Sequence, residues 1–333
     1  MDLVPVSVRS RALAVILMVA VVVAEGVAAG PPARAARDPR HGTWVLIEAS
    51  SVRTLNRAAP GIRRALRLNG VVGLSVRVPW TALEHRKGRY DFRILNRARR
   101  LAGRRNLLAV RFIAGRSTPS FRRGHSMVYD GSATGGRGRG SVVPLPFGRN
   151  GGPNHVFERG WKQLVNHLAR WSRHHRVRIL HLSWPGLLWA ELALVDQMMR
   201  QPGYSYAAAK GTHLRLLAHA LRRTTRRLWV GFATTGHAPN QLRMDIHRRL
   251  VASQRWRRCF MQANNVAPGG WGLPSAPPPP KRGAQMVGGS NTYDWNAVYR
   301  AVRGMYATYL EVYSSSFQGG TSGQLAREAA AFA

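Results

Sequence analysis

From residue 42 onward, short apolar stretches alternate with longer amphipathic ones, and this alternation constrains the fold more than any other feature. The apolar stretches are rich in Val, Ile and Leu, as expected of parallel strands that are covered on both faces. They predict strands at residues 43–49, 71–78, 107–113, 177–183, 228–233, 259–263, 283–287 and 308–313. Apolar residues at helical spacing predict helices at 58–68, 93–102, 157–174, 214–222, 243–252, 294–306 and 324–332. Eight such alternations predict an α/β protein folded as a (β/α)8 TIM barrel.

An open doubly wound sheet is the competing fold. It would need a glycine-rich phosphate-binding turn between an early strand and a helix. The glycine-rich segment 135–138 follows none of the expected strands and opens none of the expected helices. The barrel is therefore favoured, with chemistry expected where the carboxyl ends of its strands meet.

The N-terminus has the pattern of a secretory signal peptide. Arg9 and Arg11 precede an apolar run at 12–24, and small residues follow at 27–29. We expect residues 1–29 to be a signal peptide, 30–41 a disordered leader and 42–333 the barrel, so that the mature protein is secreted. The run is short for a membrane span and is stopped by Glu25, although an uncleaved anchor is the alternative.

The formal net charge of +37 raises the question of a nucleic-acid or anionic-polymer binder. Only four of the 51 basic residues are Lys, which suggests a coding bias toward Arg, and the arginines are spread along the chain. We therefore interpret them as a solvated basic surface, which attracts acidic polymers by simple Coulomb forces. No specific nucleic-acid partner is expected.

The single cysteine, Cys259, excludes an intrachain disulfide and a thiolate metal cluster, and its apolar neighbours indicate a buried strand residue. No His-x-x-x-His or His/Asp cluster predicts a metal, and no Gly-x-Ser-x-Gly elbow predicts a serine hydrolase. We expect no metal and no cofactor.

The second expected strand leads into the most distinctive motif of the chain, RVPWTALEHRKGRYDF at residues 77–92. It resembles the R-x-x-W-x-x-L-E-P-x-x-G-x-Y-D-F run of barrel glycoside hydrolases of the β-galactosidase and cellulase superfamily. The matching residues are Arg77, Trp80, Leu83, Glu84, Gly88, Tyr90, Asp91 and Phe92. His85 stands where the pattern prefers Pro. The resemblance extends over about residues 42–121 and is topological beyond them, and it implies hydrolysis of an O-glycosidic bond.

Glycosidic cleavage needs two carboxyl groups on either side of the bond. Glu191 is the expected proton donor, because it follows the fourth strand, where the resemblance places the acid/base Glu. Its apolar neighbours Trp184 and Trp189 favour a protonated carboxyl. Ala190 replaces the Asn that usually precedes the family's Glu, and the alternative is that Glu191 caps a helix.

Glu311 is the expected nucleophile or general base. It lies within the eighth strand, where a carboxylate must be paired to be buried, and Arg77 or Arg111 is the expected partner. The resemblance places the nucleophile on the seventh strand, which offers Gln285 and no acid, so a structural ion pair is an equal alternative. Glu48, at the end of the first strand, is a third candidate acid, with a bond to a backbone amide as its alternative.

A sugar site also needs flat apolar faces and polar groups that bind hydroxyls. The expected substrate-binding residues near strand ends are Arg77, Trp80, Trp184, Trp189, Gln262, Asn264 and Glu48. Each Trp could instead be core packing, and His181 is expected to be a satisfied core residue. The sequence thus predicts a secreted glycoside hydrolase that acts on an oligo- or polysaccharide. A non-catalytic carbohydrate-binding barrel is the alternative, and the oligomeric state is not determined.

Overall fold

The computed structural model describes residues 41–189, 191–224, 227–234, 238–252, 258–264, 282–285 and 294–333. The predicted signal peptide and all of the predicted leader except His41 lie outside these residues. Within the described part of the chain, no helix is both long and apolar enough to cross a membrane.

Eight parallel strands close into a barrel in the order β1-β12-β11-β10-β9-β8-β5-β2, which confirms the predicted fold class. The strands are β1 (Gly42–Glu48), β2 (Val71–Pro79), β5 (Leu107–Ile113), β8 (Val177–Leu182), β9 (Trp229–Thr234), β10 (Cys259–Asn264), β11 (Arg282–Gln285) and β12 (Tyr309–Tyr313). The ring closes where β1 pairs with both β2 and β12, with Glu48 opposite Arg77 and Trp44 opposite Glu311.

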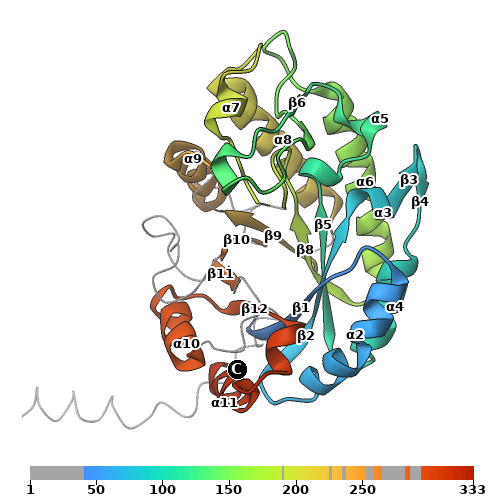
Figure 1. The fold of residues 1–333 in the computed structure, drawn as a ribbon, viewed down its shortest axis with the longest axis vertical. Helices are drawn as coiled ribbons and strands as arrows, with labels where there is room; N and C mark the ends of the chain where they lie inside the picture. Colours follow the sequence, from blue (N-terminus) through green and yellow to red (C-terminus); the bar gives the residue numbers. More distant parts are fainter. Residues whose placement is uncertain are drawn as a thin grey trace, which may run out of the picture. The chain divides into compact units, whose positions relative to one another are not determined.

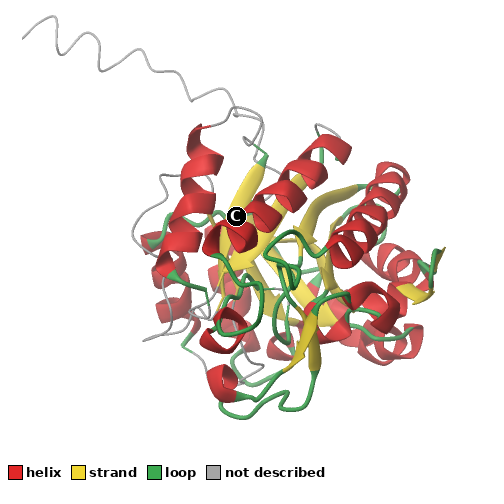
Figure 2. Ribbon diagram, turned by 90° about the horizontal axis from the view of Figure 1, so that it is seen from above, coloured by secondary structure: helices red, strands yellow, loops and turns green. Residues whose placement is uncertain are grey.

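Helices lie on the outside of the strands (Figures 1 and 2). They are α2 (Val52–Ala65), α4 (Arg93–Ala102), α6 (His155–His174), α8 (Tyr206–Arg223), α9 (Asn240–Ala252), α10 (Trp295–Gly304) and α11 (Ser322–Phe332). Two of them, α2 and α8, begin at least six residues earlier than the apolar spacing predicted. Ser51 caps α2 by accepting from Thr54 N at 3.2 Å, and Ser205 caps α8. These serines satisfy free amides of the first turn and so extend each helix toward its N-terminus.

The inside of the barrel is layered. Nearest the amino ends of the strands, an apolar and aromatic cluster fills the ring: Trp44, Ala109, Ile179, Phe260 and Tyr309. Polar and charged side chains occupy the next layer, and the carboxyl ends of the strands form the mouth above it. A packed, layered interior of this kind is typical of (β/α)8 barrels, although its central layer is normally apolar.

Two long connections cross the mouth. The one after β5 contains the short helices η1 (Gly115–Ser117) and α5 (Ser120–Arg123) and the hairpin of β6 (Ser126–Val128) and β7 (Val142–Pro144). The one after β8 runs to α7 (Asp196–Met199). Gln197 joins the two by donating to Val128 O at 2.8 Å and accepting from Asp130 N at 3.0 Å.

Candidate active site

Glu311 lies at the centre of the polar layer, with its side chain fully buried. Both carboxylate oxygens are held by donors from strands around the ring. Oε1 accepts from Ser75 and from the hydroxyl of Tyr309, each at 2.5 Å. Oε2 accepts from Arg111 Nη2 at 2.7 Å and from Gln262 Nε2 at 3.0 Å.

The titration of this cluster is set by burial and by Arg111. Burial raises the pKa of Glu311, but the charge of Arg111 and the hydrogen bonds outweigh it and bring the pKa to about 2. Burial, and then Arg111, hold the pKa of His181 well below its usual value, so this ring is neutral. His181 contacts Arg111 Nη2 at 3.2 Å and the Tyr309 hydroxyl at 3.0 Å. It is a satisfied core residue.

This geometry does not suit the role of nucleophile predicted for Glu311. A carboxylate that is closed off from solvent and accepts a hydrogen bond at each of four directions has no free lone pair to offer a substrate. Arg111, one of its two predicted partners, forms the ion pair. Gln262, predicted to bind substrate, is also fully buried, and it bonds both Glu311 and Arg111. Glu311 and Gln262 therefore belong to the buried hydrogen-bonded layer below the mouth.

Arg77 and Glu48 form the first part of the mouth. Nη1 of Arg77 lies 2.6 Å from Oε1 of Glu48 and 3.4 Å from the hydroxyl of Tyr313. The Arg77 side chain is 2% exposed, whereas that of Glu48 is 49% exposed. Burial alone would lower the pKa of Arg77, but neighbouring groups raise it well above its usual value: Tyr313, Glu191, Glu48 and Glu311. A permanent cation therefore stands among the candidate acids.

The connection after β8 brings Glu191 and Trp189 to the mouth. Its backbone is fixed at two points, because Arg116 N donates to Leu187 O at 2.8 Å and Leu192 N donates to Ala233 O at 2.9 Å. The connection thereby spans the ends of β5 and β9. Glu191 is 9% exposed and lies close enough to Arg77 to influence its pKa.

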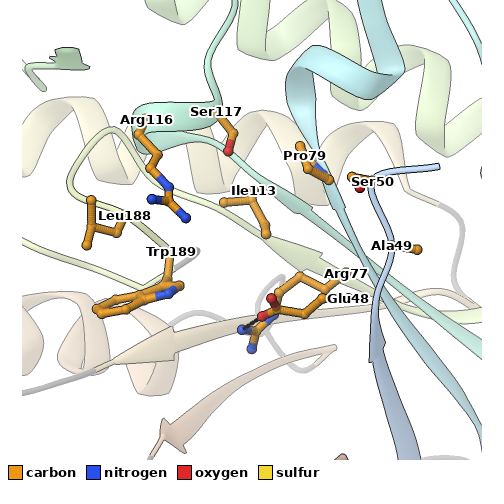
Figure 3. A pocket seen from close by; sticks show the side chains of 10 residues that line it. All are labelled: Glu48, Ala49, Ser50, Arg77, Pro79, Ile113, Arg116, Ser117, Leu188 and Trp189. Atoms are coloured by element: carbon orange, nitrogen blue, oxygen red, sulfur yellow. Dashed lines mark hydrogen bonds and ion pairs between the residues drawn. The ribbon is translucent and has the colours of Figure 1, made fainter. Parts of the chain in front are cut away.

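A cavity of about 310 Å³ opens at this mouth (Figure 3). Its wall consists of strand ends and of the two connections: Glu48, Ala49, Ser50, Arg77, Pro79, Ile113, Arg116, Ser117, Leu188 and Trp189. This volume is at the lower end of the range for small-molecule sites, about 300–1,000 Å³. An aromatic ring, two guanidinium groups and a carboxylate thus face one hollow at the carboxyl ends of the strands.

Four of the predicted binding residues are not part of this cavity wall. Three of them are buried elsewhere, and the side chain of the fourth is outside the described part of the chain. Trp80 is fully buried, packs against Phe112 and Phe157, and donates its indole N–H to Glu84 at 2.9 Å. Trp184 is fully buried and packs against His213 of α8 and Phe232 of β9. Neither offers a face to a sugar. Gln262 is in the polar layer, and the side chain of Asn264 lies outside the described part.

The motif around Glu84 has a structural explanation. Glu84 is fully buried and accepts from Trp80 Nε1, from Gly88 N at 2.9 Å and from Arg122. Gly88 has a φ of 78° in the turn between β3 (Glu84–Arg86) and β4 (Arg89–Tyr90), which suits glycine. The Trp, Glu and Gly of the motif therefore form one hydrogen-bonded unit beside the mouth.

Sequence reasoning did not identify Arg116 and Tyr313 as mouth residues. Tyr313 ends the eighth expected strand two positions after Glu311, so the alternation of side chains places it on the same interior face, one layer higher. Arg116 follows the third strand directly. Its position at a strand end was the available signal, but the many other arginines obscured it.

Comparison with known proteins supports the fold but not a family. No protein-family model matches the sequence, and no curated protein matches it. The catalytic domain of β-amylase from Paenibacillus polymyxa superposes with a TM-score of 0.57 at 7% identity, over 88% of this chain and 98% of that one. The chain shares the barrel fold of β-amylase.

Two other glycoside hydrolases are more distantly similar. Xylanase B from Clostridium stercorarium F9 has a TM-score of 0.45 at 6% identity, covering 82% of this chain and 86% of that chain. A β-galactosidase from Rahnella sp. R3 has a TM-score of 0.41 at 12% identity, covering 70% and 40%. At these identities the likeness concerns the fold alone.

Among the described residues, no group of three or more His, Cys, Asp or Glu side chains is arranged to hold a metal ion. The acids at the mouth are dispersed around Arg77 instead. What the arrangement can offer is a pair of carboxyl groups, Glu48 and Glu191, near one fixed cation, with an aromatic face at Trp189.

Proposed function

We propose that the protein is a glycoside hydrolase that binds a saccharide at the barrel mouth and cleaves an O-glycosidic bond with two carboxyl groups. The observation that carries this proposal is the position of Arg77. It pairs with Glu48 at 2.6 Å and lies within electrostatic reach of Glu191, at the end of the barrel where such enzymes do chemistry. The β-amylase-like fold supports the same class of reaction.

Glu191 is the proposed proton donor. Its carboxyl group is nearly completely buried, and in this role it gives a proton to the leaving oxygen. Glu48 takes the second role in place of Glu311. Its carboxylate is half exposed at the cavity, where it can either attack the anomeric carbon or activate water. Arg77 orients Glu48 in either case.

Aryl glycosides with good and poor leaving groups test these roles. A poor leaving group needs the proton from Glu191, so Glu191→Gln should lower kcat/KM by about 100-fold or more for phenyl glycosides and much less for dinitrophenyl glycosides. Glu48→Gln should lower turnover of both substrates. Asp196→Asn, in α7, is the matched control and should retain wild-type rates. Full turnover in Glu191→Gln or Glu48→Gln removes that residue from the mechanism.

The burial of Glu311 favours a second candidate, a non-catalytic carbohydrate-binding barrel. Of the three predicted catalytic acids, only Glu48 and Glu191 are left at the mouth, because Glu311 is buried below it. Glu48 is already paired with Arg77. If the barrel only binds carbohydrate, we expect saturable sugar binding without turnover. We then also expect Glu191→Gln to leave the affinity for the sugar unchanged.

We also propose that the protein is exported. The basic residues, apolar run and small residues of the first 29 positions support this proposal. Expression of the full chain should yield a product in the culture medium whose N-terminus lies near residue 30. A product that stays with the cells and begins at Met1 would contradict cleavage.

A further inference from the structure

Arg116 occupies a defined place at the wall of the cavity. Its backbone belongs to η1, and its amide is fixed to Leu187 O at 2.8 Å. Its side chain extends from this anchor into the space shared with Trp189 and Arg77 (Figure 3). Within the part of the chain that the structure describes, the guanidinium of Arg116 makes no hydrogen bond or ion pair.

The other charges at the cavity wall are already matched. Glu48 pairs with Arg77 at 2.6 Å, so the carboxylate does not compensate Arg116. The wall therefore presents a cation whose donors point into the cavity. A guanidinium recognises planar anions with two parallel N–H donors, which a carboxylate matches closely.

We propose that the cavity binds a sugar that carries a carboxylate, namely a uronic acid unit of an acidic oligo- or polysaccharide. Arg116 pairs with the carboxylate, and the ring of Trp189 packs against the sugar. The inference rests on the proposed saccharide-binding function and names its substrate class. The formal charge of +37 acts in the same direction, because it attracts acidic polymers to the protein.

Short oligosaccharides test this assignment without the general attraction of long polyanions. The probes are uronic acid di- and trisaccharides, the same compounds after reduction of each carboxyl to a primary alcohol, and sulfated oligosaccharides. Affinities are measured by calorimetry at physiological ionic strength, where remote charges are largely screened. The variants are Arg116→Gln and, as a control, Arg67→Gln. Arg67 is an exposed arginine at the opposite end of the barrel, just before β2.

We expect the wild type to prefer a uronic acid probe over its reduced form by about tenfold or more, which is the effect of a charged hydrogen-bonded pair. Arg116→Gln should abolish this preference, and Arg67→Gln should retain it. Equal binding of charged and reduced probes, or preference for sulfated ones, overturns the inference and leaves the proposed function intact. A lack of binding to any sugar overturns both. Binding of uronic acid that depends on Arg116 without turnover supports the inference and contradicts the catalytic proposal.

Discussion

Arg111 and Glu311 form an ion pair of 2.7 Å in the interior of the barrel, and both side chains are completely buried. The pair joins β5 to β12 across the ring. Burying two charges costs a large solvation energy, which only a complete set of hydrogen bonds can offset. Here Ser75, Gln262 and Tyr309 complete the set around the Glu311 carboxylate. The polar layer therefore depends on every member being present.

Removal of one partner should destabilise the protein strongly. We expect Glu311→Gln and Arg111→Met each to lower the free energy of unfolding by about 3–5 kcal/mol, because each leaves a buried charge or its donors unmatched. The double variant should lose clearly less than the sum of the two single losses. Urea unfolding followed by tryptophan fluorescence measures all three. Strict additivity would contradict a direct interaction.

The same pair predicts a pH dependence of stability. The pKa of Glu311 is about 2 in the folded protein against an ordinary value of 4.5, so its contribution is complete above about pH 4.5 and lost as the pH falls toward 2. The shift corresponds to roughly 3 kcal/mol. Urea unfolding of wild type and Glu311→Gln between pH 7 and pH 3 should show a stability difference that shrinks below pH 4.5. A difference independent of pH would show that Glu311 is not held as a carboxylate.

The sequence was sufficient to predict the barrel because each strand is a continuous apolar run and each predicted helix has apolar residues at helical spacing. All eight predicted strands correspond to strands of the ring, and their ends differ by at most two residues. Alternation also indicated correctly that Glu311 faces inward. The alternation of side chains along a strand does not show how deep in the barrel an inward-facing residue lies. The stagger of the strands around the ring decides whether an inward residue lies at the mouth or one layer below it.

The tryptophans illustrate the same limit. Trp80 and Trp189 both lie in segments that follow a strand, yet Trp80 is fully buried and donates to Glu84, whereas Trp189 lines the cavity. Arg122, which lies 38 residues from Glu84 in sequence, completes the buried site that holds the Trp80–Glu84 unit. Contacts of such separation leave no local signal in the sequence.

Two glycines with a similar backbone conformation should respond differently to alanine. Gly88 and Gly115 have φ values of 78° and 57°. A Cβ at Gly88 meets no atom within 4 Å, so Gly88→Ala should cost only the backbone strain, about 1–2 kcal/mol. A Cβ at Gly115 would overlap the carbonyl oxygen of Leu187, which anchors the connection that carries Trp189 and Glu191.

Gly115→Ala should therefore cost roughly 3 kcal/mol or more and should also weaken sugar binding, because the connection must move. Gly88→Asn serves as the control for strain, since Asn tolerates a positive φ better than Ala does. Urea unfolding and calorimetry on the same samples separate the two effects. If Gly115→Ala is no more harmful than Gly88→Ala, the connection is not fixed at this point.

A matched pair of tryptophan variants separates packing from binding. Trp80 is fully buried, and Trp80→Ala removes a core ring together with its bond to Glu84, which should lower the free energy of unfolding by about 3–5 kcal/mol. Trp189 is only partly buried at the cavity wall. Trp189→Ala should cost less stability but lower sugar affinity by about tenfold, because the ring loses its contact with the ligand. Trp189→Phe keeps an aromatic face and should restore most of that affinity. An unchanged affinity in Trp189→Ala would place the saccharide elsewhere than the cavity at the mouth.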